Sequence, residues 1–277
     1  MGDLDRILGV VSEVRRRVVR VALVLGPLFG ALLLVRLVPV RLELYGVALP
    51  LAYPWPSPFY NVTAQLFRGM VAWMLPPGIT LLNVGVADSV VVQMEIGLLL
   101  TVILGMPWIV HEVAAFLVPA LRRNERTLLR QVGVPATALF ALGTAVGVFW
   151  LTPFTFRLLF LYVAAMGLAP VLGVQSFVTF ALLYSLAFGV VFELPVFIYA
   201  LTRLGVVRAA AWRRHWRGAV LVSLLFGMIV TPDNSGITML LIAAPMIALY
   251  FGGAYFAARW ERRSTRARPP AASVGAG

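Results

Sequence analysis

The sequence predicts an all-α integral membrane protein with six transmembrane helices and with both termini in the cytoplasm. Three observations support this prediction. Hydrophobic residues make up 61% of the chain, charged residues make up 12%, and the mean hydropathy is +0.93, whereas a water-soluble domain carries about 25% charged residues. Long apolar runs recur along the chain, and arginines gather between them. We expect a single polytopic membrane domain at 1–258, followed by a basic, disordered cytoplasmic tail at 259–277.

Five apolar runs are each of the length that crosses a bilayer, which takes about 20 residues. These runs are 18–40, 89–111, 132–156, 175–202 and 236–258. A sixth run, 218–230, is shorter and is by itself also compatible with a re-entrant or interfacial segment.

The distribution of arginine decides for six spans, because cytoplasmic loops near span ends collect positive charge. The chain has 23 basic residues, and all of them are arginines. With six spans, all but four lie on one side of the membrane. The four on the outer side are Arg36, Arg41, Arg68 and Arg157. A five-span arrangement would place the arginine-rich tail outside, so we count 218–230 as a short fifth span that thins the bilayer locally.

A long outer loop, residues 39–88, connects the first two spans. Its early part, "LPLAYPWPSPFY", is rich in proline and aromatic residues, which predicts a rigid extended segment at the headgroup level. Val62, Leu66 and Met70 follow at helical spacing, which predicts a helix lying on the outer surface.

The composition argues against catalytic and nucleic-acid functions. The chain has no cysteine, so thiolate ligands and disulfides are excluded. His111-Glu112 starts like a zinc-protease motif, but no second histidine follows four residues later. There is no P-loop signature. The formal charge of +12 comes from clusters next to the spans, which suits anionic lipids better than nucleic acid. We therefore expect no metal, no cofactor and no enzymatic activity.

Carboxylates at membrane depth are costly unless they face protein or water. Glu193 lies inside the run 175–202, shortly before Pro195. From the residues alone, it is either a hydrogen-bonded structural group or part of a cavity open to a substrate or partner helix. Near the ends of the second span, Glu95 and Glu112 are expected to be interfacial and to pair with arginines that reach them.

Four segments resemble, in order and with compatible spacing, motifs of the TatC family, the multispanning subunit of the twin-arginine protein translocase. "SEVRRRVV" resembles the family's N-terminal Glu-Leu-Arg-x-Arg element. "HEVAAFLVPALRRNER" is similar to its first cytoplasmic loop. "VFELPV" matches its fourth span, and "TPDNSGITMLLIAAPM" resembles the turn into its sixth span. The matching residues are Glu13, Arg15, Arg17, Phe116, Pro119, Leu121, Glu125, Arg126, Phe192, Glu193, Pro195 and Asp233.

The chain departs from the family pattern at two places on the outer face. One proline is missing before Asp233, and Gly236-Ile237-Thr238 stands where the family has a glutamine. The first outer loop is also longer than in the common bacterial form. These differences leave the role of Asp233 open between a functional contact and a cap of the last span.

The resemblance implies a receptor in the cell membrane for the twin-arginine signal peptide of folded cargo proteins. Glu125 would be the principal acceptor and Glu13 its neighbour, because a guanidinium binds a carboxylate through two parallel hydrogen bonds. The signal-peptide set would also contain Arg15, Arg17, Phe116, Pro119, Leu121 and Arg126. Glu193, Phe192, Pro195 and Asp233 would contact the membrane-embedded part of the peptide or the single-span TatA- and TatB-like partners. Self-association and export driven by the proton-motive force are implied as well.

Two alternatives stay open on the residues alone. The arginine run around Glu125 could serve only to fix the topology. A secondary transporter of a small solute would also use carboxylates inside the membrane. Such transporters are commonly built from repeated halves, and we find no internal repeat in this sequence.

Overall fold

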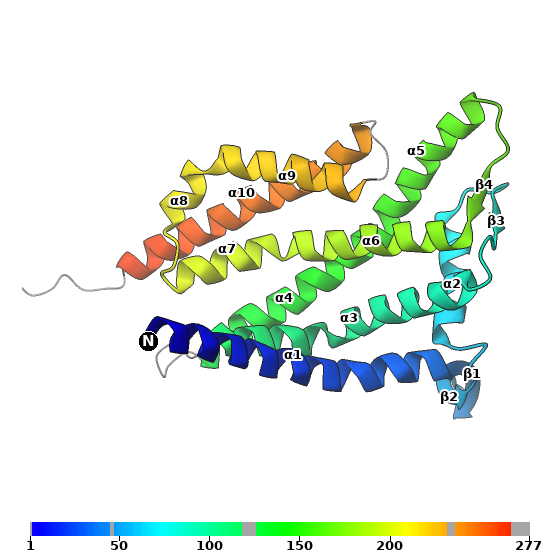
Figure 1. Cartoon of the computed structure of the whole chain (residues 1–277), viewed down its shortest axis with the longest axis horizontal. Helices are drawn as coiled ribbons and strands as arrows, with labels where there is room; N and C mark the ends of the chain where they lie inside the picture. Colours follow the sequence, from blue (N-terminus) through cyan, green and yellow to red (C-terminus); the bar gives the residue numbers. More distant parts are fainter. Residues whose placement is uncertain (1, 45–46, 118–125, 232–235, 267–277) are drawn as a thin grey trace, which may run out of the picture. The chain divides into compact units, whose positions relative to one another are not determined.

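The computed structural model describes residues 2–44, 47–117, 126–231 and 236–266 (Figure 1). The described chain is mainly helical. It forms two compact units, Met1–Gly189 and Val190–Gly277, and each unit has its own cluster of buried apolar side chains. The predicted single domain at 1–258 remains a prediction.

Five helical stretches are long and apolar enough to cross a membrane, which confirms the five long spans. They are Val11–Leu34, Asp88–Val113, Val132–Ala165, Val174–Arg203 and Ile237–Arg263. The short sixth run is also helical, as Trp216–Val230. Its length is below that of an ordinary span, so the total of six spans stays a prediction.

The first unit is built around two long helices that lie side by side, α1 (Gly2–Leu34) and α3 (Asp88–Leu117) (Figure 1). α4 (Arg126–Val146) packs against α3, and α6 (Val174–Phe192) contributes Phe177 and Val178 to the buried cluster that contains Ile96 of α3. The start of α1, the end of α3 and the start of α4 lie at the same end of this unit (Figure 1).

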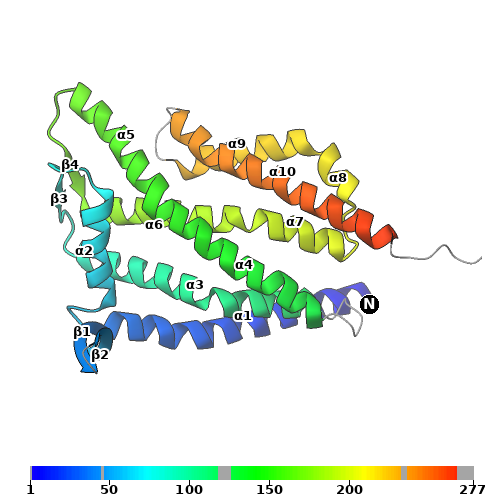
Figure 2. The same cartoon turned by 180° about the vertical axis from the view of Figure 1, so that it is seen from behind.

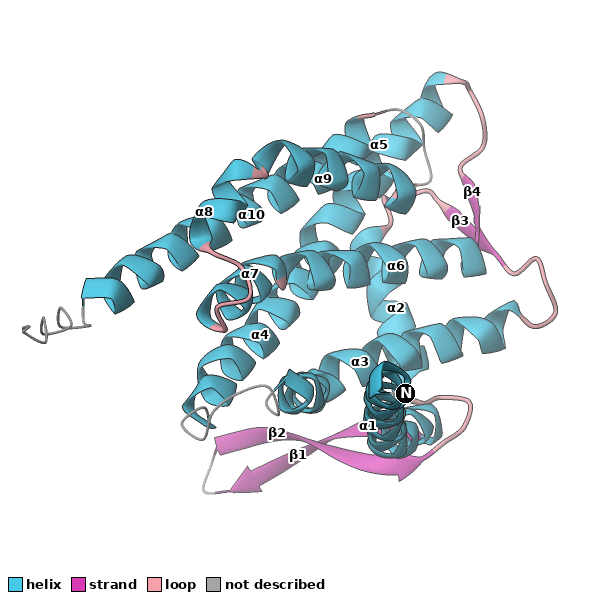
Figure 3. Ribbon diagram, turned by 60° about the vertical axis from the view of Figure 1, so that its left-hand side comes forward, coloured by secondary structure: helices cyan, strands magenta, loops and turns pink. Residues whose placement is uncertain are grey.

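The first span ends at Leu34, not at residue 40 as predicted. The chain continues as strand β1 (Val35–Leu44), which pairs antiparallel with β2 (Val47–Pro56) (Figure 3). Valine and leucine interrupted by arginine and proline suit a strand, and Pro39 disfavours helix at the residue before it. Extended backbone was predicted for residues 49–60, which overlap β2, whereas the start of β1 was assigned to the first span and the pairing of the two strands was not predicted.

A second two-stranded sheet also departs from the all-α prediction. β3 (Thr80–Leu82) pairs parallel with β4 (Val171–Gly173). The prediction of a purely all-α protein was therefore wrong in this detail, since two two-stranded sheets accompany the helices. The three-residue strands are too short to leave a recognisable pattern in the sequence.

The predicted helix of the first outer loop is present as α2 (Val62–Met74). Asn61 caps it, because its Oδ1 accepts hydrogen bonds from Ala64 N at 2.9 Å and from the Thr63 hydroxyl at 2.7 Å. The Asn61 Nδ2 donates to Leu33 O at 2.8 Å and to Gln93 Oε1 at 2.7 Å. One buried amide therefore ties the end of α1 and the start of α2 to α3.

α2 is docked on the unit by its apolar face. Met70 and Met74 are buried in a cluster that includes Ile96 of α3 and Phe177 of α6. The methionine spacing of four residues places both side chains on one face of the helix. Whether α2 also lies on the outer membrane surface stays a prediction.

The third span is interrupted by a π-helical turn. α4 passes through Gly147–Leu151 into α5 (Thr152–Ala165), and the three segments form one inclined rod (Figure 2). A Cβ atom at Gly147 would lie 2.8 Å from the Cα of Ser185 in α6. Glycine is required here because the two backbones touch.

The second unit contains α7 (Leu194–Arg203), α8 (Ala209–Arg214), α9 (Trp216–Val230) and α10 (Ile237–Arg266). α10 packs along α7 and α9 (Figure 1). The Tyr250 hydroxyl donates to Trp212 O at 2.6 Å, and the Trp212 ring nitrogen donates to Thr202 Oγ1 at 3.0 Å. These two bonds join α10, α8 and α7.

The basic tail was predicted to begin at 259, yet α10 continues through Arg266. Arginine and glutamate are good helix formers, and Glu261 Oε2 accepts a hydrogen bond from Ala209 N at 3.1 Å. This bond attaches the extension to the start of α8. Residues 267–277 lie outside the described part of the chain.

We predict that Gly253→Ala destabilises the second unit by about 1–3 kcal/mol, the usual cost of overpacking. A Cβ atom at Gly253 would lie 2.8 Å from the Cα of Pro195. Gly252→Ala is the matched control, since a Cβ there has no neighbour within 4 Å. Thermal unfolding of the purified proteins in detergent measures the difference. Equal melting temperatures for the two variants would contradict the close approach of α10 and α7.

Candidate functional site

A cluster of charged side chains lies at the end of the first unit that carries the N-terminus. Glu13 and Arg17 are separated by four residues and therefore lie on the same face of α1. The Arg17 Nε donates to Glu13 Oε1 at 2.7 Å, and its Nη2 lies 2.6 Å from the same oxygen. This pairing fixes one oxygen of the Glu13 carboxylate.

Arg17 also reaches across to α3. Its Nη1 lies 3.2 Å from Glu112 Oε2 and 3.2 Å from the Glu112 backbone oxygen. The Glu112 side chain is only 6% exposed, and that of Arg17 is 14% exposed. A buried carboxylate needs a partner of this kind, because an unpaired buried charge is strongly destabilising. The expectation that an arginine reaches Glu112 is confirmed.

Glu13 keeps an accessible edge. Its side chain is 32% exposed, and its second oxygen, Oε2, lies 3.8 Å from the Nη2 of Arg16, whose side chain is 66% exposed. An exposed pair at this distance contributes little energy. Arg17 therefore holds Oε1 of Glu13, while Oε2 remains within reach of an incoming hydrogen-bond donor. Arg15 lies exposed on α1.

The segment predicted to carry the main acceptor lies between α3 and α4 in the sequence. α3 ends at Leu117 and α4 begins at Arg126, so Phe116 belongs to α3 and Arg126 opens α4. The predicted residues Glu125, Pro119 and Leu121 lie outside the described residues.

Glu193 lies at the junction of α6 and α7, between Phe192, the last residue of α6, and Pro195 in the first turn of α7. Its side chain makes no capping hydrogen bond to α7. Within the described part of the chain, Glu193 Oε1 is buried and has no hydrogen-bond partner. A buried polar atom in this condition requires an explanation. Asp233, the fourth residue predicted for membrane contacts, lies outside the described residues.

Glu95 has a different partner from the one expected. The Thr179 hydroxyl of α6 lies 2.8 Å from Glu95 Oε1 and 3.0 Å from Oε2, whereas an arginine was expected. Nothing in the sequence pointed to this pair, because the two residues are far apart in the chain and threonine is common in apolar helices. Among the described residues, no group of three or more His, Cys, Asp or Glu side chains is arranged to hold a metal ion.

The sequence pattern of the TatC family, "Sec-independent protein translocase protein (TatC)", matches residues 10–245 of this chain. A relative with that name from Cenarchaeum symbiosum (strain A) is 38% identical over 256 residues, 92% of this chain and 96% of the relative. Its namesake from Escherichia coli (strain K12) is 29% identical over 198 residues, 72% of this chain and 76% of that protein.

A solved structure, "Crystal Structure of Twin Arginine Translocase Receptor- TatC", is also similar. The TM-score is 0.72 at 22% sequence identity, and the likeness covers 92% of this chain and 100% of that chain. At this level of identity the comparison shows a shared fold, which includes the arrangement of the long helices.

We predict that Arg17→Gln lowers the melting temperature by about 6–12 °C, because removing one partner of a buried pair costs about 3 kcal/mol in a protein of this size. Arg16→Gln is the matched control, since it removes the same charge from an exposed position on the same helix. Adding Glu112→Gln to Arg17→Gln should restore part of the loss. Similar melting of the Arg16 and Arg17 variants in detergent would show that the bridge between α1 and α3 is not structural.

Proposed function

This chain belongs to the TatC family of Sec-independent protein translocase proteins, and from that premise we propose that it binds the twin-arginine signal peptide of folded cargo at the Glu13 cluster. Family membership makes it a multi-pass membrane component of a protein translocase and favours protein export over the transport of a small solute. The finer assignment to particular residues is argued below from the site.

The observation that carries the proposal is the state of Glu13. Its carboxylate is fixed by Arg17, and it is still partly exposed with Oε2 turned to the solvent-accessible Arg16. A fixed carboxylate with one oxygen still accessible can accept a charge-assisted hydrogen bond from an incoming guanidinium. Arg17 then acts by positioning, because its own guanidinium is engaged with Glu13 and Glu112.

Glu125 is the principal acceptor in this proposal. It belongs to the segment that joins α3 and α4, at the end of the unit where Glu13 lies. The proposed peptide site also includes Phe116, Pro119, Leu121 and Arg126. Two neighbouring acceptors match a peptide with two consecutive arginines. The surrounding arginines, including Arg15, compete for the carboxylates, so a peptide must fit by geometry as well as by charge.

The apolar part of the signal peptide follows the membrane-embedded face near the junction of α6 and α7. Glu193 Oε1 is buried there without a hydrogen-bond partner in the described chain, which supports a role in accepting a hydrogen bond from another molecule. The proposed donors belong to the peptide or to single-span TatA- and TatB-like subunits. Phe192, Pro195 and Asp233 complete this contact, and the proton-motive force supplies the energy for passage.

We propose that the protein lies in the cytoplasmic membrane with six spans and with both termini in the cytoplasm. The inner face then carries the Glu13 cluster, where cargo arrives, and the clustered arginines contact anionic lipids. The short helix α9 is the fifth span. Self-association within a larger complex and the absence of a bound cofactor are parts of the same proposal.

We predict that Glu13→Ala and Glu125→Ala each weaken binding of a fluorescent twin-arginine signal peptide by about tenfold or more, because each removes a charge-assisted hydrogen-bond acceptor. The assay uses the purified protein in nanodiscs with anionic lipid. A peptide with Lys-Lys in place of Arg-Arg has equal charge and should bind weakly to the native chain. Glu95→Gln is the control, since it removes a carboxylate at the other end of α3. Equal binding of all variants and both peptides would refute the receptor site.

We predict that the chain crosses the membrane six times, which single-cysteine labelling can test because the chain has no cysteine of its own. In intact cells, an impermeant maleimide should label Ser89→Cys, at the start of α3. It should label Ser273→Cys only after the membrane is permeabilised. Labelling of the Ser273 variant in intact cells would mean that α9 does not cross and that the tail is outside.

A further inference from the structure

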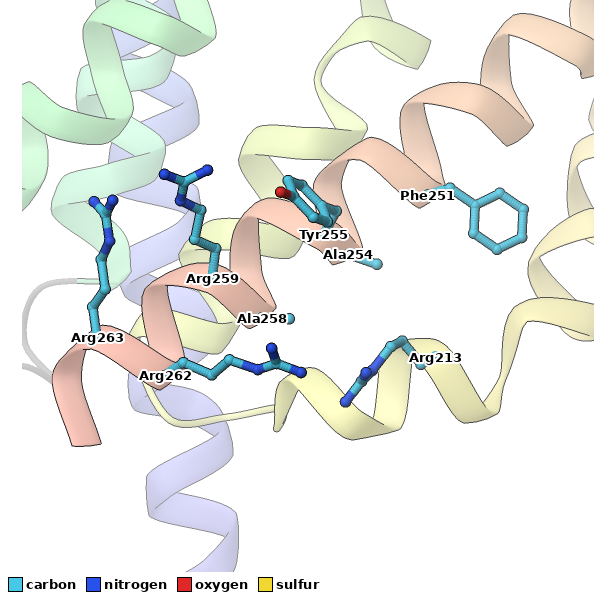
Figure 4. Close-up of a pocket in the computed structure, with 8 residues that line it drawn as sticks. All are labelled: Arg213, Phe251, Ala254, Tyr255, Ala258, Arg259, Arg262 and Arg263. Atoms are coloured by element: carbon cyan, nitrogen blue, oxygen red, sulfur yellow. The ribbon is translucent and has the colours of Figure 1, made fainter. Parts of the chain in front are cut away.

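The second unit carries a basic cavity of about 500 Å³ between α8 and the last turns of α10 (Figure 4). Its lining residues are Arg213, Phe251, Ala254, Tyr255, Ala258, Arg259, Arg262 and Arg263. Arg213 of α8 and Arg262 of α10 extend toward each other, while Arg259 and Arg263 project together from another side of α10 (Figure 4). The cavity belongs to neither the Glu13 cluster nor the Glu193 junction.

The charge of this cavity is one-sided. Four of its eight described lining residues are arginines, and none of the eight is acidic. Glu261 lies in the same stretch but does not line the cavity, and its Oε2 accepts a hydrogen bond from Ala209 N. Arginines near a helix C-terminus are favoured by the helix dipole, but that effect does not require a second helix to add Arg213 to the group. Guanidinium groups that line a cavity attract an anion.

The lining of the cavity changes character along α10. From Phe251 to Arg263 the lining residues recur at intervals of one, three or four positions, and they lie along about 18 Å of the helix. Phe251 and Ala254 come first, Tyr255 and Ala258 follow, and the arginines come last. Tyrosine and arginine at a span end are typical of the headgroup region, with apolar residues deeper in the membrane.

This gradient matches the chemistry of one ligand class. A phospholipid has an apolar chain, a polar linkage and a phosphate in the same order. The small side chains of Ala254 and Ala258 leave room between α10 and α8, and exposed guanidinium groups form charge-assisted bonds to phosphate oxygens. A water-soluble phosphate ester shares the phosphate but has no apolar chain to contact the apolar half of the cavity.

We propose that this cavity is a specific binding site for the phosphate headgroup of an anionic phospholipid, with the start of a lipid chain lying along Ala254 and Phe251. The site anchors the arginine-rich end of α10 at the membrane surface. This lipid site is independent of signal-peptide recognition, and its test contains no peptide. A negative result for the lipid site therefore does not contradict the proposed peptide site, and the reverse also holds.

The test titrates lipids onto the full chain, purified in a neutral detergent, and counts bound lipids by native mass spectrometry. Phosphatidylglycerol is compared with phosphatidylcholine of the same chains. We expect the anionic lipid to bind at least about tenfold more tightly, and Arg259→Gln/Arg262→Gln to abolish most of that preference. Arg214→Gln/Arg217→Gln is the matched control, because it removes the same charge from exposed arginines outside the cavity. That control should change binding less than about twofold.

A second variant separates shape from charge. Ala258→Trp fills the cavity and leaves every arginine in place, so it should weaken the first bound anionic lipid as strongly as the double arginine variant. Melting temperatures check that each protein is folded. Even if the double variant fails to fold, the Ala258→Trp result still decides the matter.

Three results would overturn the proposal. Equal losses in the two double variants would indicate diffuse attraction to the whole basic surface. An unchanged affinity in Ala258→Trp would place the lipid elsewhere. Displacement of phosphatidylglycerol by an equal concentration of inorganic phosphate would assign the site to a soluble anion.

Discussion

The guanidinium of Arg17 makes the contacts on which the N-terminal end of the first unit depends. It holds Glu13 on its own helix and the buried Glu112 on α3. A carboxylate as buried as Glu112 is tolerated only with such a partner, so α1 cannot separate from α3 without exposing or stranding a charge. The same bridge fixes the carboxylate of Glu13.

The opposite end of this unit is held by a neutral network. The buried Asn61 side chain connects α1, α2 and α3 through backbone and amide partners, and Met70 and Met74 pack α2 onto the apolar cluster. Between the two ends, packing is apolar, as expected where no water can satisfy backbone groups and only internally bonded helices are stable. Polar contacts at both ends, together with apolar packing between them, fix the position of α1 along α3.

Two features of the described chain are the ones to which we assign contacts with other molecules. Glu193 Oε1 is buried with no partner in the described chain, and four arginines line one cavity at the end of α10. Natural sequences are locally consistent except where function demands otherwise. The π-helical turn at Gly147–Leu151 is a further irregularity of this kind, and the structure gives it a packing reason in the contact of Gly147 with Ser185.

The sequence alone determined the membrane class, the five long spans and the helix at 62–74, because hydropathy and helical periodicity are local properties of the chain. It also marked Glu193 as an unusual acid and suggested an arginine partner for Glu112, while Glu13 was singled out only by the resemblance to the TatC family. The tertiary structure decided which arginine this is, that Thr179 faces Glu95, that residues 35–56 pair as a hairpin, and that Arg213 joins three arginines of α10. These facts depend on contacts between residues distant in the chain, and composition and spacing carry no information about which distant segments meet.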